Sequence, residues 1–200
     1  FLVDAGGGNT ILSNLEKADI SINNIHNMFI SHNHNDHILG AVWVIRSVAN
    51  SMLNSKYNGV FNIDCHKKSI EALKSICSFV LQKKFLKLFD DKILFHEICN
   101  NTSVNILGRP TTFFDINSTK ELQHGFTTIL ENGKRLTFLG DEPYRDELLQ
   151  YCYNTHFLMH EAFCLYSQKD IFKPYEKHHA TAKDACINAD KLNVKNIILY

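Results

Sequence analysis

The chain has 200 residues, enough for one domain with a sizeable hydrophobic core. Its 21 basic and 21 acidic residues balance, so no global positive field indicates a nucleic-acid-binding protein. The six cysteines form no Cys-x-x-Cys pair, and no run approaches the ~20 apolar residues of a membrane span. We therefore expect free thiols in a reducing, cytoplasmic compartment and no membrane partner.

Both ends of the sequence lie within apolar stretches that predict strands, residues 1–3 and 194–200, and there is no initiator Met. We expect an excerpt of a longer protein. The first strand runs into Asp4 and three glycines, which permit a tight turn before a helix over residues 10–19. A phosphate-binding P-loop is excluded because no Lys-Ser/Thr follows the glycines.

A histidine-rich stretch follows a predicted strand at residues 28–30 and precedes a predicted helix at residues 38–53. It places His32, His34, Asp36 and His37 within six residues. Imidazole and carboxylate are ligands of zinc and similar ions, and in an extended H-x-H the two imidazoles share a face. The alternative is a solvated, histidine-rich loop, but this spacing between a strand and a helix favours a metal site.

The following elements alternate between helix and strand. The helix at 38–53 is expected to bury Trp43 in the core, and residues 59–65 predict a buried strand. Residues 70–88 predict an amphipathic helix rich in lysine. Such a helix could contact nucleic acid, but the balanced charge of the chain favours a solvated face.

From residue 93 the pattern is β, with strands at 93–95, 103–107, 111–116, 122–130 and 134–139. The Asn132-Gly133 pair between the last two predicts a hairpin. That hairpin would bring His124 and Asp141 to the same end of a sheet. His124 is therefore interpreted as a metal ligand, although a lone histidine on a strand is more often packed or solvated.

The last part of the chain predicts a helix at 143–151, a strand at 157–159 and a helix at 182–192. Two short motifs lie between them, His160-Glu161-Ala162-Phe163 and His178-His179-Ala180-Thr181. No repeat or linker divides the sequence, so residues 1–200 predict a single hydrolase domain.

Taken together, the hexapeptide and the later motifs resemble the metallo-β-lactamase superfamily, and within it the ribonuclease Z-like branch. The resemblance implies an α/β (α+β) fold, the αββα metallo-β-lactamase sandwich, here truncated at both ends. It also implies a binuclear, metal-dependent hydrolase whose nucleophile is a metal-bound hydroxide. The two divalent ions are expected to be Zn²⁺, with Mn²⁺ or Fe²⁺ as alternatives.

The resemblance further implies a role for each candidate residue. One ion would be held by His32, His34 and His124, and the other by Asp36 and His37, with Asp141 bridging both. Asp4 would support the metal loop without contacting metal, and a last metal-binding histidine is expected just beyond Tyr200. The expected catalytic residues are Asp36, His179 and Glu161; His179 would protonate the leaving oxygen while Glu161 orients it. The alternative for His160, His178 and His179 is a set of loop residues on the surface.

The sequence departs from ribonuclease Z in several respects. Only sixteen residues separate His124 from Asp141, so the long arm that grips transfer RNA is absent. Ala180 and Phe163 also replace the usual Ser and Thr. We therefore expect a phosphodiesterase acting on a small phosphodiester or similar ester, with nucleic acid not favoured as a substrate, and we expect a homodimer.

Two alternatives stay open. Tyr144, three residues after Asp141, matches the position of a tyrosine in lactonases of the same superfamily, where a phenol could orient a lactone carbonyl. The other alternative is a non-catalytic, metal-binding scaffold that keeps the fold for protein contacts.

Overall fold

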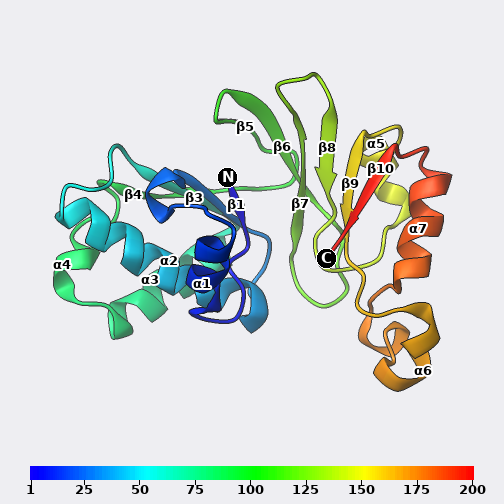
Figure 1. Cartoon of the computed structure of the whole chain (residues 1–200), viewed down its shortest axis with the longest axis horizontal. Helices are drawn as coiled ribbons and strands as arrows, with labels where there is room; N and C mark the ends of the chain where they lie inside the picture. Colours follow the sequence, from blue (N-terminus) through cyan, green and yellow to red (C-terminus); the bar gives the residue numbers. More distant parts are fainter. The chain divides into compact units, whose positions relative to one another are not determined.

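The computed structural model describes all residues, 1–200, and the chain divides into two compact units, Phe1–Ile98 and Cys99–Tyr200 (Figure 1). Each unit combines a sheet with helices, so the α/β class predicted from the sequence is confirmed. The prediction of a single domain over residues 1–200 stays a prediction.

The first unit contains a parallel sheet in the order β1-β2-β3-β4. Its strands are β1 (Leu2–Val3), β2 (Asn27–Ile30), β3 (Phe61–Cys65) and β4 (Ile93–Glu97). Its helices are α1 (Thr10–Lys17), η1 (Ile22–Asn24), α2 (Asn35–Leu53), α3 (Lys67–Val80) and α4 (Lys83–Leu86). Parallel strands require crossover connections, and here the helices between successive strands supply them.

The core of the first unit lies between the sheet and α2. Met28 and Ile30 of β2 and Ile63 of β3 are fully buried, and they belong to one apolar cluster with Ile45 and Val48 of α2. The alternation along the strands and the helical spacing along α2 therefore place one apolar stripe of each element in this core. This packing fixes the carboxyl ends of β1 and β2, where the metal-loop residues begin.

The second unit contains a six-stranded sheet in the order β10-β9-β8-β7-β6-β5. Its strands are β5 (Ser103–Ile106), β6 (Arg109–Asp115), β7 (His124–Ile129), β8 (Arg135–Phe138), β9 (Phe157–His160) and β10 (Asn196–Leu199). Its helices are η2 (Asp146–Leu148), α5 (Leu149–Cys152), η3 (Tyr166–Gln168), α6 (Lys169–Phe172), η4 (Tyr175–Lys177) and α7 (Ala182–Lys191). Strands β5 to β8 are antiparallel neighbours, whereas β9 is parallel to both β8 and β10.

The predicted hairpin at Asn132-Gly133 is confirmed as the turn between β7 and β8. Phe126 pairs with Phe138, and Gly133 has the positive φ of 74° that such a turn needs from glycine. On the other side of the pair, Phe113 of β6 stands opposite Phe126. These rings, with Tyr200 beyond Phe138, form a row of aromatic contacts across one face of the sheet.

Two predicted helix boundaries were wrong. Helix α2 begins at Asn35, not at residue 38, because His34 already adopts the extended conformation of an N-cap. Asp36 and His37 therefore lie in the first turn of the helix, and Asp36 gains the favourable field of the helix N-terminus. The predicted helix at 143–151 begins only at Asp146, because the Arg145 backbone is held extended while its guanidinium pairs with Glu142 at 2.7 Å.

The lysine-rich helix predicted at 70–88 is two helices, α3 and α4. The backbones of Leu81 and Gln82 are extended between them, and the break lets Phe85 enter the core of the first unit. The lysines at both ends, Lys67 and Lys83 among them, are exposed to solvent as expected.

Trp43 was expected in the core, and this was wrong. Its side chain is 40 % exposed, because it lies on the outer stripe of α2 and not on the stripe of Ile38 and Ile45. All six cysteines are free thiols, as expected. The helices fall short of what a membrane span requires in length and apolar character.

Candidate functional site

In the first unit the metal loop is organised by Asp4, which follows β1. Its backbone has a φ of 51°, in the left-handed region that aspartate tolerates better than most residues. Its carboxylate accepts hydrogen bonds from the Ser31 amide at 2.8 Å, the Ser31 hydroxyl at 2.7 Å and His37 Nδ1 at 2.9 Å. Asp4 thus ties the end of β2 to the first turn of α2, in the supporting position expected of it.

The same hydrogen bonds decide which ring nitrogens can bind a metal. Since the Ser31 hydroxyl donates to Asp4, its oxygen accepts from His32 Nδ1, 2.9 Å away. The nitrogen of His32 that could bind a metal is then Nε2, which faces His34 Nδ1 at 2.9 Å. Two nitrogens on one tetrahedral zinc ion, each at ~2.0–2.1 Å, stand ~3.3 Å apart, so this pair fits such an ion with little movement.

A second pair is formed by Asp36 and His37. Asp4 fixes the proton of His37 on Nδ1, which leaves Nε2 as the nitrogen that can ligate, and Asp36 Oδ2 lies 3.8 Å from it. The His32 and His37 ring centroids are 4.1 Å apart, so the two pairs adjoin. The donor set of this loop therefore fits two neighbouring divalent ions. The structure brings together all four residues that the hexapeptide singled out.

Two further contacts hold this loop, and the sequence analysis did not identify either. A Cβ at Gly40 would lie 1.8 Å from the Ala5 carbonyl oxygen, so only glycine lets α2 approach the chain next to Asp4. The Ser69 hydroxyl at the start of α3 donates to the side chain of Asn33 at 2.7 Å. Asn33, which looked like a spacer in the motif, is thus an anchor of the loop.

In the second unit the candidate residues gather at one edge of the sheet. His124 is the first residue of β7, and Asp141 and Glu161 follow the ends of β8 and β9. Because β7 runs antiparallel to β8, and β8 parallel to β9, these three positions lie at the same edge. Gly125 permits the close strand pairing here, since a Cβ would meet the Phe138 carbonyl oxygen at 2.4 Å.

The environment of His124 favours the neutral imidazole. The side chain is buried, and burial lowers its pKa, although the nearby Asp115 carboxylate works in the opposite direction. Neutral imidazole is the form that binds metal ions, so this burial suits a ligand. Asp115, which pairs with His124 across β6 and β7, had no signal in the sequence because strand register had to be known first.

The second group in this unit is Asp141, Glu161 and His179. His179 Nδ1 lies 3.3 Å from Glu161 Oε2 and 3.9 Å from Asp141 Oδ1. Glu161 Oε1 also accepts the Ala180 amide at 2.5 Å, and the Phe163 ring stacks on the imidazole at 4.7 Å. The imidazole of His179 is therefore held on two sides, with Nε2 as its outward nitrogen.

The remaining histidines of the two motifs differ in role. His160 is fully buried at the end of β9, and burial lowers its pKa; its Nδ1 donates to the Glu161 carbonyl oxygen at 2.7 Å. It is thus a structural support of Glu161 and not the surface residue of the alternative interpretation. His178 is exposed, and its ring approaches the Thr119 hydroxyl at 3.4 Å.

Tyr144, the residue on which the lactonase alternative depends, contacts a different part of the second unit. Its ring is in contact with the apolar cluster of Leu148 and Leu192. Burial and the neighbouring Asp146 carboxylate raise its pKa to about 12. No hydrogen bond joins its hydroxyl to Asp141, Glu161 or His179.

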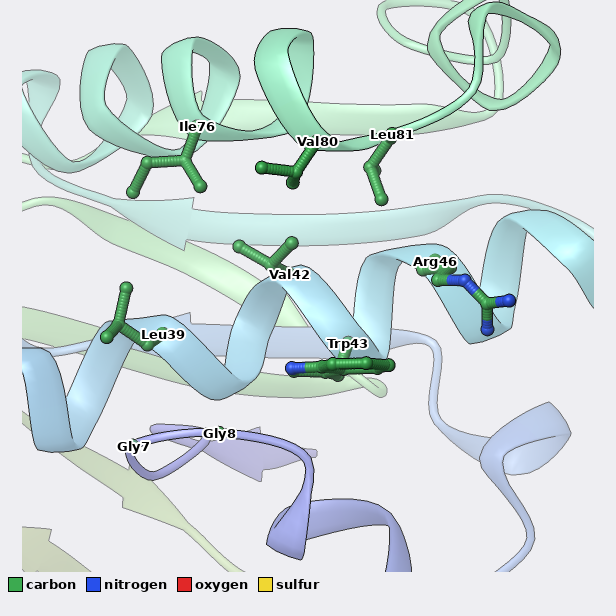
Figure 2. Close-up of a pocket in the computed structure, with 9 residues that line it drawn as sticks. All are labelled: Gly7, Gly8, Leu39, Val42, Trp43, Arg46, Ile76, Val80 and Leu81. Atoms are coloured by element: carbon green, nitrogen blue, oxygen red, sulfur yellow. The ribbon is translucent and has the colours of Figure 1, made fainter.

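The outer stripe of α2 borders a groove of about 470 Å³ in the first unit (Figure 2). Leu39, Val42, Trp43 and Arg46 line it from α2, while the end of α3 and the Gly7-Gly8 turn form its sides. The Arg46 guanidinium makes no ion pair or hydrogen bond within the chain. The groove is therefore apolar with one uncompensated positive charge.

Sequence reasoning also missed Lys120 and Glu142. Lys120 Nζ lies 3.3 Å from His179 Nε2 and 3.7 Å from Asp141 Oδ2. Glu142 is buried, next to Asp141, and holds the loop that carries Lys120. The Asp141-Glu142 pair was a usable signal in the sequence. A second carboxylate beside a candidate metal ligand, if buried, must have hydrogen-bond or ion-pair partners.

The comparisons with known proteins agree with this architecture. Human tRNase Z, short form, has a TM-score of 0.78 at 18% identity, covering 98% of this chain and 79% of that one. The metallo-β-lactamase fold protein YhfI from Bacillus subtilis has a TM-score of 0.73 at 16% identity, covering 98% and 72%. Ribonuclease Z of Prochlorococcus marinus is 26% identical over 253 residues, covering all of this chain and 77% of the relative.

The metallo-β-lactamase fold predicted from the sequence is thus confirmed, as is the likeness to ribonuclease Z-like proteins. The groups of imidazoles and carboxylates in this fold could hold metal ions. A family model described as anti-Pycsar protein Apyc1 matches residues 1–184. The chain belongs to that family.

Proposed function

We propose that this protein is a binuclear metal-dependent phosphodiesterase that acts on small phosphodiesters. The observation that carries the proposal is the cluster of Asp141, Glu161 and His179. It sets an imidazole, oriented by a buried carboxylate, beside a candidate metal ligand. Hydrolysis of an ester with a poor leaving group needs such a proton donor near the metal.

The metal assignment follows the donor chemistry described above. One ion would be held by His32, His34 and His124 and the other by Asp36 and His37, with Asp141 as a shared ligand; zinc would suit these N and O ligands best, with Mn²⁺ or Fe²⁺ as alternatives. When bound, such ions lower the pKa of coordinated water from 15.7 to ~7, so that a nucleophile is present at neutral pH. The assignment draws on residues of both units and is part of the proposal.

The residues of the chain supply the remaining steps. Asp4 keeps the proton of His37 on Nδ1, and Ser31 does the same for His32, so Nε2 of each ring would be free to bind a metal ion. Glu161 Oε2 lies 3.3 Å from Nδ1 of His179, within ion-pair distance, so Nε2 is the nitrogen that points outward. A proton on Nε2 passes to the leaving oxygen as the ester bond breaks.

Several features favour a small substrate over transfer RNA. Between His124 and Asp141 the chain forms only the β7–β8 hairpin, so nothing there can act as an RNA-gripping arm. The alignment with the Prochlorococcus ribonuclease Z is longer than this chain, so that relative has insertions absent here. The balanced charge gives no global attraction for nucleic acid, and the free cysteines fit a cytoplasmic protein.

Lactonase activity is the second candidate, and a non-catalytic scaffold is the third. The contacts of Tyr144 weaken the case for lactonase activity, because its hydroxyl makes no hydrogen bond to the candidate catalytic residues. Metal-loaded protein should be assayed on bis(p-nitrophenyl) phosphate, an acyl-homoserine lactone and a β-lactam. Hydrolysis of the phosphodiester supports the proposal, preferential hydrolysis of the lactone supports its rival, and inactivity on all three favours the scaffold.

We further propose that the protein is a homodimer and that the groove on α2 is the dimer interface (Figure 2). Asp36, Leu39, Trp43 and Arg46 lie along one stripe of the helix. The stripe is symmetric about Ala41, since Leu39 and Trp43 are two residues from it and Asp36 and Arg46 are five residues from it.

A two-fold axis near Ala41 would therefore set Leu39 against the partner's Trp43. Such self-complementarity is what an isologous interface requires. Trp43→Asp should turn a dimer into a monomer in analytical ultracentrifugation, and Phe79→Asp, at an exposed apolar position outside the stripe, is the control. A monomeric wild-type protein would contradict the proposal.

A further inference from the structure

The loop between β6 and β7 is built on the buried carboxylate of Glu142. Glu142 Oε1 accepts from the Ser118 hydroxyl at 2.6 Å and from the Thr119 amide at 3.2 Å. The guanidinium of Arg145 pairs with Oε2 at 2.7 Å and also donates to the Asn117 carbonyl oxygen at 2.5 Å. A buried charge with this many partners fixes the backbone of the loop tightly.

The Ser118 hydroxyl extends the same network to the next residues. It accepts from the Lys120 amide at 3.1 Å and from the Gln123 side-chain amide at 3.3 Å. Gln123 in turn accepts from the Asp141 amide at 3.2 Å. The backbone around Lys120 is thus tied to the backbone around Asp141 by side chains that have no direct part in the proposed chemistry.

The outcome of this network is the position of the Lys120 ammonium group. Its Nζ lies 3.3 Å from His179 Nε2 and 3.7 Å from Asp141 Oδ2, with its side chain only 19% exposed. The ammonium therefore occupies the outward side of the imidazole, where the leaving oxygen of a substrate would have to be. The separation from Asp141 is longer than that of a close ion pair.

We propose that Lys120 is a substrate-binding residue whose ammonium group pairs with a non-bridging oxygen of the phosphodiester. The proposal rests on the proposed function and names a residue that recognises the anionic substrate of that site. In the absence of substrate the ammonium lies beside His179 Nε2; when the ester binds, it shifts to the phosphoryl oxygen, and Nε2 takes up a proton from solvent and faces the leaving oxygen.

Charge supports this assignment. A phosphodiester is a monoanion, and among the side chains of this cluster the carboxylates of Asp141 and Glu161 would repel it, apart from the attraction of the proposed metal ions. The Lys120 ammonium is the cation in contact with this cluster, and a partly buried cation binds a phosphoryl oxygen through a charge-assisted hydrogen bond. A neutral lactone would gain little from it, so the residue also favours the phosphodiester over the lactone.

The test compares Lys120→Met with Lys134→Met, an exposed lysine in the hairpin turn at the opposite end of β7. Inorganic phosphate is the probe, and its dissociation constant is measured by calorimetry on metal-loaded protein with metal content checked. Loss of one charge-assisted hydrogen bond predicts binding weakened about 10- to 100-fold in Lys120→Met, with no change in Lys134→Met. Lys120→Arg should recover part of the affinity.

Kinetics give a second readout that separates Lys120 from the acid. Lys120→Met should raise KM and lower kcat/KM by the same factor for bis(p-nitrophenyl) phosphate and diphenyl phosphate, because a non-bridging oxygen is indifferent to the leaving group. A defect that shrinks with the better leaving group would show that Lys120 acts only through His179. That result, unchanged phosphate binding, or altered metal content would each overturn the proposal.

Failure of the proposed function would give a different set of results. A wild-type protein that hydrolyses no phosphodiester, yet binds phosphate in a manner that depends on Lys120, keeps the anion-binding assignment and refutes the phosphodiesterase. If wild-type protein and Lys120→Met hydrolyse phosphodiesters equally well, the phosphodiesterase is kept and the assignment of Lys120 is refuted.

Discussion

Glu161 holds His179 through both of its carboxylate oxygens. Oε2 lies 3.3 Å from Nδ1 of the imidazole, and Oε1 accepts the amide of the next residue, Ala180, at 2.5 Å. The ring and the backbone of the histidine segment are therefore positioned by one buried side chain. This arrangement sets the direction in which Nε2 of His179 points.

Replacement of His179 by alanine tests the proton donor. His179→Ala should keep its metal and lower kcat roughly 10²- to 10⁴-fold on an ester with a poor leaving group, the usual contribution of general acid–base catalysis. The loss should be smaller with p-nitrophenolate as the leaving group, which needs little protonation. Glu161→Gln should lower kcat by a smaller factor, ~10- to 100-fold, as for other residues that orient an imidazole. Release of metal from His179→Ala would instead identify His179 as a ligand.

Replacement of Asp4 tests the support of the metal loop. Asp4→Asn leaves the size of the side chain unchanged but weakens the acceptor for Ser31 and His37. We expect metal affinity to fall ~10- to 100-fold, the usual cost of losing a hydrogen bond that orients a ligand. Competition with a chelator of known affinity measures this, and Asp19→Asn, on the exposed turn after α1, is the control. Equal affinities for wild type and Asp4→Asn would show that the hydrogen bonds do not tune the site.

Much of this site could be predicted from spacing alone. His32, His34, Asp36 and His37 are close in sequence, so a strand followed by a helix is enough to gather them. His124 and Asp141 could be related because a hairpin with a recognisable turn connects them. The pairing of Glu161 with His179 depended on a family resemblance, since seventeen residues separate the two along the chain.

The residues that escaped prediction depend on tertiary contacts. Lys120 is one of many lysines, and only the network around Glu142 distinguishes it. The prediction for Trp43 was wrong because a large apolar residue on an amphipathic helix is normally buried. The hydropathy of the sequence does not show that this side of α2 borders a groove. The start of α2 was misplaced because His34 caps the helix through its backbone conformation, which its residue type does not indicate.

The close approach of α2 to the residue after Asp4 predicts a marked sensitivity at Gly40. In Gly40→Ala the new Cβ would lie 1.8 Å from the Ala5 carbonyl oxygen, so the backbone must move. Overpacking of this kind costs about 1–3 kcal/mol of unfolding free energy. Gly8→Ala is the matched control, since nothing lies within 4 Å of its Cβ. Chemical denaturation should separate the two variants, and equal stability would contradict the packing described here.

The capping box of α7 predicts a pH-dependent contribution to stability. Burial alone would raise the pKa of Asp184, but hydrogen bonds from Thr181 and Tyr175 outweigh it and the pKa is lowered. A carboxyl whose pKa is depressed on folding stabilises the protein above its unfolded pKa of ~3.9, and this contribution is lost as the pH falls through the folded value.

Asp184→Asn should therefore cost ~0.5–2 kcal/mol at pH 7, the usual range for a helix cap. The difference between wild type and variant should shrink as the pH falls below ~4. Urea denaturation at a series of pH values measures both. A difference that stays constant down to the lowest pH would mean that the charge of Asp184 has no part in the cap.

The most direct test of the central claim is hydrolysis of bis(p-nitrophenyl) phosphate, followed on one preparation before and after metal removal. The proposed function predicts hydrolysis by the metal-loaded protein, its loss on chelation, its return when Zn²⁺ or Mn²⁺ is added, and its absence from Asp141→Ala. Hydrolysis that persists after chelation, or a fully metal-loaded protein that leaves the phosphodiester intact, would contradict it.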